Sequence, residues 1–134
     1  MAARLSLLLA IVYTIVLTIL SLIQLGDLSV GEFSPTDKML HTVANFLLAV
    51  VWMLFYLLKM DQKQNYIPAF IVISVFVIIF GILIEVLQGA LTTYRQPDWA
   101  DVVANSIGVL LALFLSFIFQ KFLIKLKHKI NLFL

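Results

Sequence analysis

Four long apolar segments divide the chain and set its fold class. They cover about residues 5–25, 39–58, 67–91 and 98–120. Each is long enough, at 1.5 Å per residue, to cross a hydrocarbon core of about 30 Å. Only 12% of the 134 residues are charged, against about 25% in soluble domains. Too little polar surface remains to coat a water-soluble globule, so the sequence predicts an all-α integral membrane protein with four transmembrane helices in a small bundle.

The first apolar segment also fits a second interpretation. Arg4 precedes an uncharged stretch from Leu5 to Leu25, and a basic start before an apolar run is typical of secretory signal peptides too. The apolar core of a signal peptide is usually about 7–15 residues long, and no Ala-x-Ala cleavage pattern follows this segment. We therefore favour an uncleaved first span.

Proline positions agree with the helix boundaries that hydropathy predicts. Pro35 follows Ser34, which can cap a helix, and precedes Asp37, which suits the positive end of the helix dipole. Pro68 and Pro97 stand at the starts of the third and fourth spans. Because proline is tolerated in the first helical turn and disrupts a helix interior, this placement supports the predicted number of helices.

The chain divides into a transmembrane domain, residues 1–120, and a basic tail, residues 121–134. In the tail, lysines alternate with large apolar residues. This pattern predicts an amphipathic helix on an anionic membrane surface; a solvated continuation of the fourth helix is the alternative.

The distribution of Lys and Arg predicts the orientation. With the N-terminus inside, only Lys38 and Arg95 of the nine basic residues face outward. The other basic residues face inward: Arg4, Lys59, Lys63, Lys121, Lys125, Lys127 and Lys129. Both termini are therefore expected on the cytoplasmic side, and the outward end is expected to be acidic.

Polar residues lie at helical spacing near the outward ends of three spans. The sets are Asp37, His41 and Asn45; Glu85 and Gln88; and Asp98, Asp101 and Asn105. Each set shares one helix face. A charge at mid-bilayer costs roughly 2.5–3.5 kcal/mol on insertion scales, so we expect the three sets to turn inward and meet.

Small residues favour close helix packing in the same region. Ala100, Ala104, Gly108 and Ala112 recur every four residues on the fourth span, and Gly81 lies one turn before Glu85 on the third. Such rows let transmembrane helices approach closely.

The polar residues, taken in order, resemble the VanZ-like family of bacterial membrane proteins over about residues 36–115. The matching positions are Asp37-Lys38-x-x-His41, Glu85-x-x-Gln88, Arg95, and Asp98-x-x-Asp101-x-x-x-Asn105-x-x-Gly108. One departure is the approach to Arg95, residues 90–94, which is longer and less glycine-rich than the short turn common in the family. The resemblance implies a role in the bacterial cell envelope, in the cytoplasmic membrane. The family takes its name from a protein linked to resistance to the lipoglycopeptide teicoplanin.

Two functions of different class fit the polar residues. In the first, the protein binds a lipid-linked or amphiphilic envelope molecule without turnover. Lys38 and Arg95 hold an anionic head in this reading, because an arginine side chain forms a planar fork for phosphate or carboxylate. His41 and Gln88 would line the same site, whereas Asn45 and Asn105 would be structural.

In the second, the protein is a membrane-embedded enzyme acting on a lipid or cell-wall precursor headgroup, with Glu85, Asp98 or Asp101 as acid or base. The chain has no cysteine, no H-E-x-x-H motif and no Gly-rich phosphate loop. We expect no metal or other cofactor; Asp37 and His41, with the nearby acids, are the residues that would hold a metal. A transporter is a weaker third reading, because four spans would have to oligomerise.

Each residue also has a purely structural interpretation. Asp98 and Asp101 suit the first turn of a helix on dipole grounds alone. Arg95 can simply pair with an acid, Lys38 can extend to the membrane interface, and His41 can be a hydrogen-bonded packing residue. Membrane lipids are the expected partners, a homo-oligomer is compatible with the sequence, and nothing beyond the basic tail suggests nucleic acid.

Overall fold

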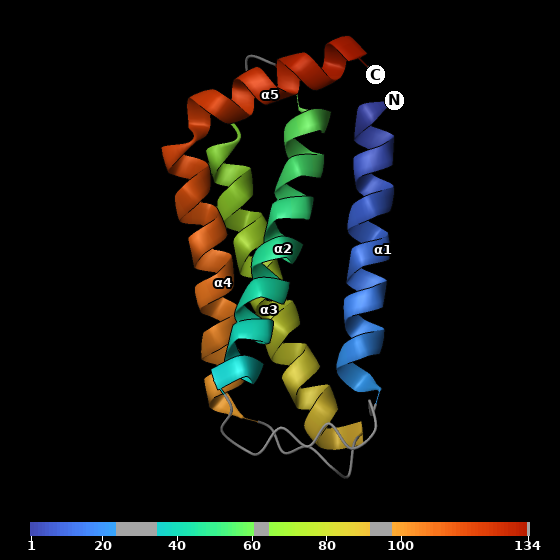
Figure 1. The fold of residues 1–134 in the computed structure, drawn as a ribbon, viewed down its shortest axis with the longest axis vertical. Helices are drawn as coiled ribbons and strands as arrows, with labels where there is room; N and C mark the ends of the chain where they lie inside the picture. Colours follow the sequence, from blue (N-terminus) through green and yellow to red (C-terminus); the bar gives the residue numbers. More distant parts are fainter. Residues whose placement is uncertain (24–34, 61–64, 92–97, 134) are drawn as a thin grey trace.

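The computed structural model consists of helices only in its described part. The described residues are 1–23, 35–60, 65–91 and 98–133. The helices are α1 (Ala2–Leu22), α2 (Pro35–Lys59), α3 (Ile67–Leu91), α4 (Trp99–Ile118) and α5 (Gln120–Phe133). The first four stand side by side as a bundle, and each is long and apolar enough to cross a membrane (Figure 1). The prediction of an all-α chain with four helices able to span a membrane is confirmed.

Helix boundaries follow local chemistry, with small shifts from the prediction. α1 begins three residues earlier than expected and ends where Ile23 adopts an extended conformation. α2 begins at Pro35, and α3 has the predicted bounds. α4 begins one residue later than expected, because Asp98 is its N-cap and accepts a hydrogen bond from the backbone N–H of Ala100 at 2.8 Å. Ser34 and Pro97 lie outside the described residues.

The closest helix pair is α2 and α4, and one glycine makes it possible. A Cβ atom on Gly108 would lie 2.1 Å from the backbone oxygen of Thr42 and 3.0 Å from the backbone nitrogen of Phe46. Ala104 and Ala112, one turn before and after Gly108, are also buried. The small-residue row predicted from the sequence therefore lies at a helix–helix contact.

Two hydrogen bonds at the middle of α1 hold it to the bundle. The Tyr13 hydroxyl donates to the backbone oxygen of Ala44 at 3.1 Å, and the Trp52 indole donates to the Thr14 hydroxyl at 3.1 Å. Few α1 residues are buried, and apolar side chains cover most of its surface. Lipid would be the natural solvent for that surface.

α5 crosses one end of the bundle, running from α4 toward the N-terminal end of α1, so both termini lie at this end (Figure 1). The chain turns at Phe119 and does not continue α4 as one straight helix. Lys127 is buried on the inner side of α5, where its ammonium donates to the backbone oxygen of Met60. The outer side presents Lys121, Lys125 and Lys129. Contact of this face with a membrane surface stays a prediction.

The apolar core fills the half of the bundle nearest α5. Its buried residues include Leu48, Met53, Leu57 and Phe70. Tyr66 is also buried here, and its hydroxyl donates to the backbone oxygen of Gln120 at 3.3 Å. Burial raises the pKa of the Tyr66 hydroxyl.

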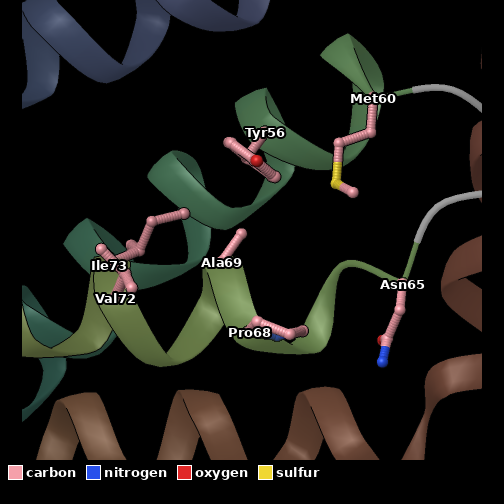
Figure 2. Close-up of a pocket in the computed structure, with 7 residues that line it drawn as sticks. All are labelled: Tyr56, Met60, Asn65, Pro68, Ala69, Val72 and Ile73. Carbon is pink, nitrogen blue, oxygen red and sulfur yellow. The ribbon is translucent and has the colours of Figure 1, made fainter.

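A hollow of about 510 Å³ lies at the same end, between α2 and α3 (Figure 2). It is lined by Tyr56, Met60, Asn65, Pro68, Ala69, Val72 and Ile73. None of the polar residues singled out from the sequence lines it, so it does not form part of their site.

Candidate functional site

Eight polar side chains from α2, α3 and α4 gather at the end of the bundle opposite α5. This polar cluster comprises Asp37, Lys38, His41, Asn45, Glu85, Asp98, Asp101 and Asn105. The start of α2, the last turns of α3 and the start of α4 all lie at that end (Figure 1). Residues more than 60 positions apart in the chain are thus neighbours, as the helical spacing predicted.

Lys38 forms ion pairs with two carboxylates of α4. Its ammonium nitrogen lies 2.5 Å from Asp98 Oδ2 and also contacts Asp101 Oδ1. Hydrogen bonding by Lys38 and, next, by the Ala100 amide lowers the pKa of Asp98 from its ordinary value. Lys38 therefore joins α2 to α4 within the described residues, and its charge is already engaged by two acids.

His41 lies at the centre of the polar cluster. Its Nδ1 is 3.2 Å from Asn105 Oδ1 and 3.6 Å from Glu85 Oε1. Its Nε2 is 3.7 Å from Asp101 Oδ2 and 3.9 Å from Asp37 Oδ1. Oxygen atoms of four side chains thus surround one imidazole, which is mostly buried.

A second layer of hydrogen bonds lies one turn deeper. Asn45 Nδ2 donates to Asn105 Oδ1 at 2.5 Å and to the backbone oxygen of His41 at 3.2 Å. The Thr42 hydroxyl lies 2.9 Å from the backbone oxygen of Lys38 and 3.1 Å from that of Ala104. Thr42 was not predicted from the sequence; its place one residue after His41 and four after Lys38 was the available signal.

Gln88 does not join this cluster through the contacts of its amide nitrogen. Nε2 donates to the backbone oxygen of Ser21 at 2.7 Å, so Gln88 links α3 to α1. The predicted ligand-binding role for Gln88 has no direct geometric support from this contact. Arg95, the other predicted anion-binding residue, lies outside the described residues.

The polar cluster is acidic, and its carboxylates range from about one-third exposed to buried. Asp37 and Asp98 are 33% and 29% exposed, whereas Glu85 and Asp101 are each 4% exposed. Four carboxylates and the Lys38 ammonium give a formal charge of −3 when His41 is neutral. A buried charge is strongly unfavourable unless it is paired and hydrogen-bonded. Within the described residues, the acids of the cluster therefore outnumber its bases.

Three of these residues have the donor atoms and the proximity of a metal-binding group. Asp37, His41 and Asp101 each offer one ligand atom, and the three atoms lie within 4.8 Å of one another. The sequence had singled out Asp37 and His41 together with the nearby acids Glu85, Asp98 and Asp101; of these acids, the structure brings Asp101 into the group. Glu85, Asp98 and Asp101, the candidate acid–base residues, all lie in the same cluster.

Comparisons with known proteins leave the family open. No protein-family model, no curated protein and no solved structure matches the chain. The VanZ-like resemblance therefore rests on the motif residues themselves.

Proposed function

We propose that this chain is a VanZ-like cell-envelope protein that binds the polar head of a lipid-linked or amphiphilic molecule at the polar cluster. One observation carries the proposal. Motif residues from three helices, widely separated in sequence, converge at one end of a bundle that is otherwise apolar. Charges in the spans of a membrane protein are expensive and usually functional.

The proposed orientation puts the cluster on the outer side of a bacterial cytoplasmic membrane and both termini in the cytoplasm. Support comes from the separation of charge: the basic residues of α5 and Arg4 lie at one end, and the acids of the cluster at the other (Figure 1). Fluorescent-protein and alkaline-phosphatase fusions to the C-terminus test this. Fluorescence without phosphatase activity is expected, and the reverse result contradicts the orientation.

Arg95 is the proposed contact for an anionic head, since Lys38 is engaged by Asp98 and Asp101. Native mass spectrometry of the purified protein in detergent tests this, with wild type beside Arg95→Ala. A defined anionic lipid on the wild type that is lost from a folded Arg95→Ala supports the head site. Absence of any specific lipid on the wild type contradicts it.

An enzyme is the second candidate function, and the contact of His41 with Glu85 favours it. His41 Nδ1 and Glu85 Oε1 are 3.6 Å apart, and both side chains are largely buried. An imidazole and a carboxylate in this position can exchange a proton with the headgroup of a bound lipid. Glu85→Gln separates the two functions. Retained lipid with loss of product formation supports an enzyme, whereas an identical set of bound molecules in both forms supports binding alone.

A link to teicoplanin resistance belongs to the same proposal. Expression of the chain in a susceptible bacterium should raise the inhibitory concentration of teicoplanin, and the Arg95→Ala variant should not. An unchanged inhibitory concentration for the wild type removes this part of the proposal and leaves the binding site to be decided by mass spectrometry.

A further inference from the structure

The hollow between α2 and α3 opens on the side of the bundle, where the helices would face lipid. Its volume of about 510 Å³ falls within the range of about 300–1,000 Å³ that small-molecule sites occupy. Pro68 and Val72, which line it, are exposed, and Ala69 and Ile73 beside them are half-buried. The core of a bilayer holds no water, so hydrocarbon would fill an open apolar hollow at this level.

The hollow is polar at one end and apolar at the other. Met60 and Asn65 lie at the end next to α5, whereas Val72 and Ile73 lie at the opposite end, farther along the span (Figure 2). Asn65 is exposed, and its Oδ1 accepts a hydrogen bond from the backbone N–H of Ile67 at 3.1 Å. This arrangement suits an amphiphile whose chain lies against α3 and whose head stays at the membrane interface.

The end of the bundle that holds the hollow is basic. Lys59, the last residue of α2, is exposed, and its ammonium lies 5.7 Å from the centre of the Phe55 ring. Four acids belong to the described residues, and all of them lie at the other end: Asp37, Glu85, Asp98 and Asp101. A negatively charged head is therefore attracted to the end that holds the hollow.

Two hydrogen bonds attach α5 beside the mouth of the hollow. Lys127 donates to the backbone oxygen of Met60, and the Tyr66 hydroxyl donates to the backbone oxygen of Gln120 at 3.3 Å. Met60 lines the hollow, and Tyr66 follows Asn65, which also lines it. The exposed lysines of α5 therefore add to the positive potential at this end of the bundle (Figure 1).

We propose that the hollow binds one anionic phospholipid from the leaflet at the α5 end, with an acyl chain between α2 and α3 and the phosphate beside Lys59. The opening toward lipid and the apolar inner end account for the chain, and the basic end accounts for the negative head. This site lies at the opposite end of the bundle from the polar cluster and does not depend on the proposed function.

Native mass spectrometry of the full chain in detergent tests the head selectivity. Dioleoyl phosphatidylglycerol should bind the wild type more tightly than dioleoyl phosphatidylcholine, which has the same chains. Lys59→Gln should weaken phosphatidylglycerol binding about fivefold. Lys129→Gln is the matched control, because it removes another exposed lysine at the same end. Its effect should be less than about twofold, since solvent screens a charge that does not touch the lipid.

Filling the hollow tests the place of the acyl chain. Ala69 points across the hollow toward α2 (Figure 2), so Ala69→Leu should occupy part of the space and weaken phosphatidylglycerol binding about tenfold. Ala90→Leu makes the same change at an exposed position near the other end of α3 and should leave binding unchanged.

Photocrosslinking distinguishes this site from the proposed head site. Phosphatidylglycerol with a diazirine in one acyl chain should label the segment 56–73, and Arg95→Ala should keep that label. A label in this segment that persists in Arg95→Ala supports the hollow even where no lipid binds at the polar cluster. A label confined to the polar-cluster end and lost in Arg95→Ala overturns the hollow and supports the proposed function.

Four further results overturn the proposal. Equal binding of the two lipids by the wild type removes the head selectivity. Equal losses in Lys59→Gln and Lys129→Gln mean diffuse attraction of anions, and unchanged binding by folded Ala69→Leu takes the chain out of the hollow. A homodimer that covers the hollow and excludes the lipid makes a second copy of the chain the occupant.

Discussion

The two ends of the bundle are held together by different physics. At the α5 end, large apolar side chains such as Leu57 and Phe70 fill the core. At the other end, ion pairs and amide hydrogen bonds link α2, α3 and α4. Apolar packing tolerates many geometries, whereas a buried polar network requires its partners in place. The cluster end therefore specifies how the helices are rotated, and the α5 end supplies contact area.

The largest expected effect comes from Gly108, which sets the distance between α2 and α4. Gly108→Ala should destabilise the protein by about 3 kcal/mol, because the new Cβ meets backbone atoms of Thr42 that cannot move alone. Gly81→Ala is the graded comparison: its Cβ would lie 3.3 Å from side-chain atoms of Asn105, and about 1 kcal/mol is expected. Thermal melting in detergent measures both, and equal melting temperatures would refute the ranking.

Next in size is the ion-pair network of the cluster end. Asp101→Asn should cost about 2 kcal/mol, since Lys38 would keep Asp98 and lose its buried partner. Asp98→Asn should cost about 1 kcal/mol, because this acid is more exposed and loses only part of its capping. Chemical unfolding in mixed micelles gives both values. A larger loss from Asp98→Asn would show that the cap, and not the buried pair, dominates.

Apolar truncation at the α5 end ranks third. Leu57→Ala should cost about 1.5 kcal/mol, less than in a soluble core. Lipid is as apolar as leucine, so packing in the bundle removes this side chain from lipid and not from water, and the variant loses packing contacts only. Leu47→Ala is a control on the same helix, since Leu57 is 2% exposed and Leu47 41% exposed. The control should be nearly neutral in the same unfolding assay. Similar losses at both positions would mean that α2 packs differently from the structure.

The smallest effects are expected on α5. Lys127→Gln should cost about 1 kcal/mol, because the buried ammonium donates to the carbonyl of Met60 at the end of α2. Lys129→Gln removes the same charge from the exposed side and should change stability by less than about 0.5 kcal/mol. Hydrogen exchange of α5 amides reads out the difference. Equal protection in the two variants would place α5 away from the bundle.

The sequence predicts the cluster end better than it predicts the α5 end. Charges are rare in these spans, so Asp37, His41, Glu85 and Asp101 had to turn inward, and helical spacing alone placed them on common faces. Apolar residues carry no such signal, because lipid-facing and buried positions look alike. This is why the core around Phe70 could not be separated from the lipid-facing surface in advance.

Individual side-chain contacts between helices could not be predicted from the sequence for a different reason. Lys38 pairs with residues 60 and 63 positions away, and Gln88 reaches the backbone of Ser21 across the bundle. Such contacts depend on the rotation and depth of each helix, which periodicity does not fix. The buried Lys127 was missed likewise, because its burial follows from the turn at Phe119 that lays α5 across the bundle.

The hydrogen-bonded attachment of α1 has a consequence for biosynthesis. Ribosomes deliver this helix to the membrane first, before Trp52 or Gln88 has been made. The only charged side chain of α1, Arg4, lies in its first turn, and apolar side chains cover most of the rest of its surface, so the helix is stable in lipid before the others arrive. Docking of α1 then requires that Trp52 and Gln88, on later helices, donate hydrogen bonds to the Thr14 hydroxyl and the backbone oxygen of Ser21. Assembly of the bundle can therefore be completed after translation, with the first helix joining last.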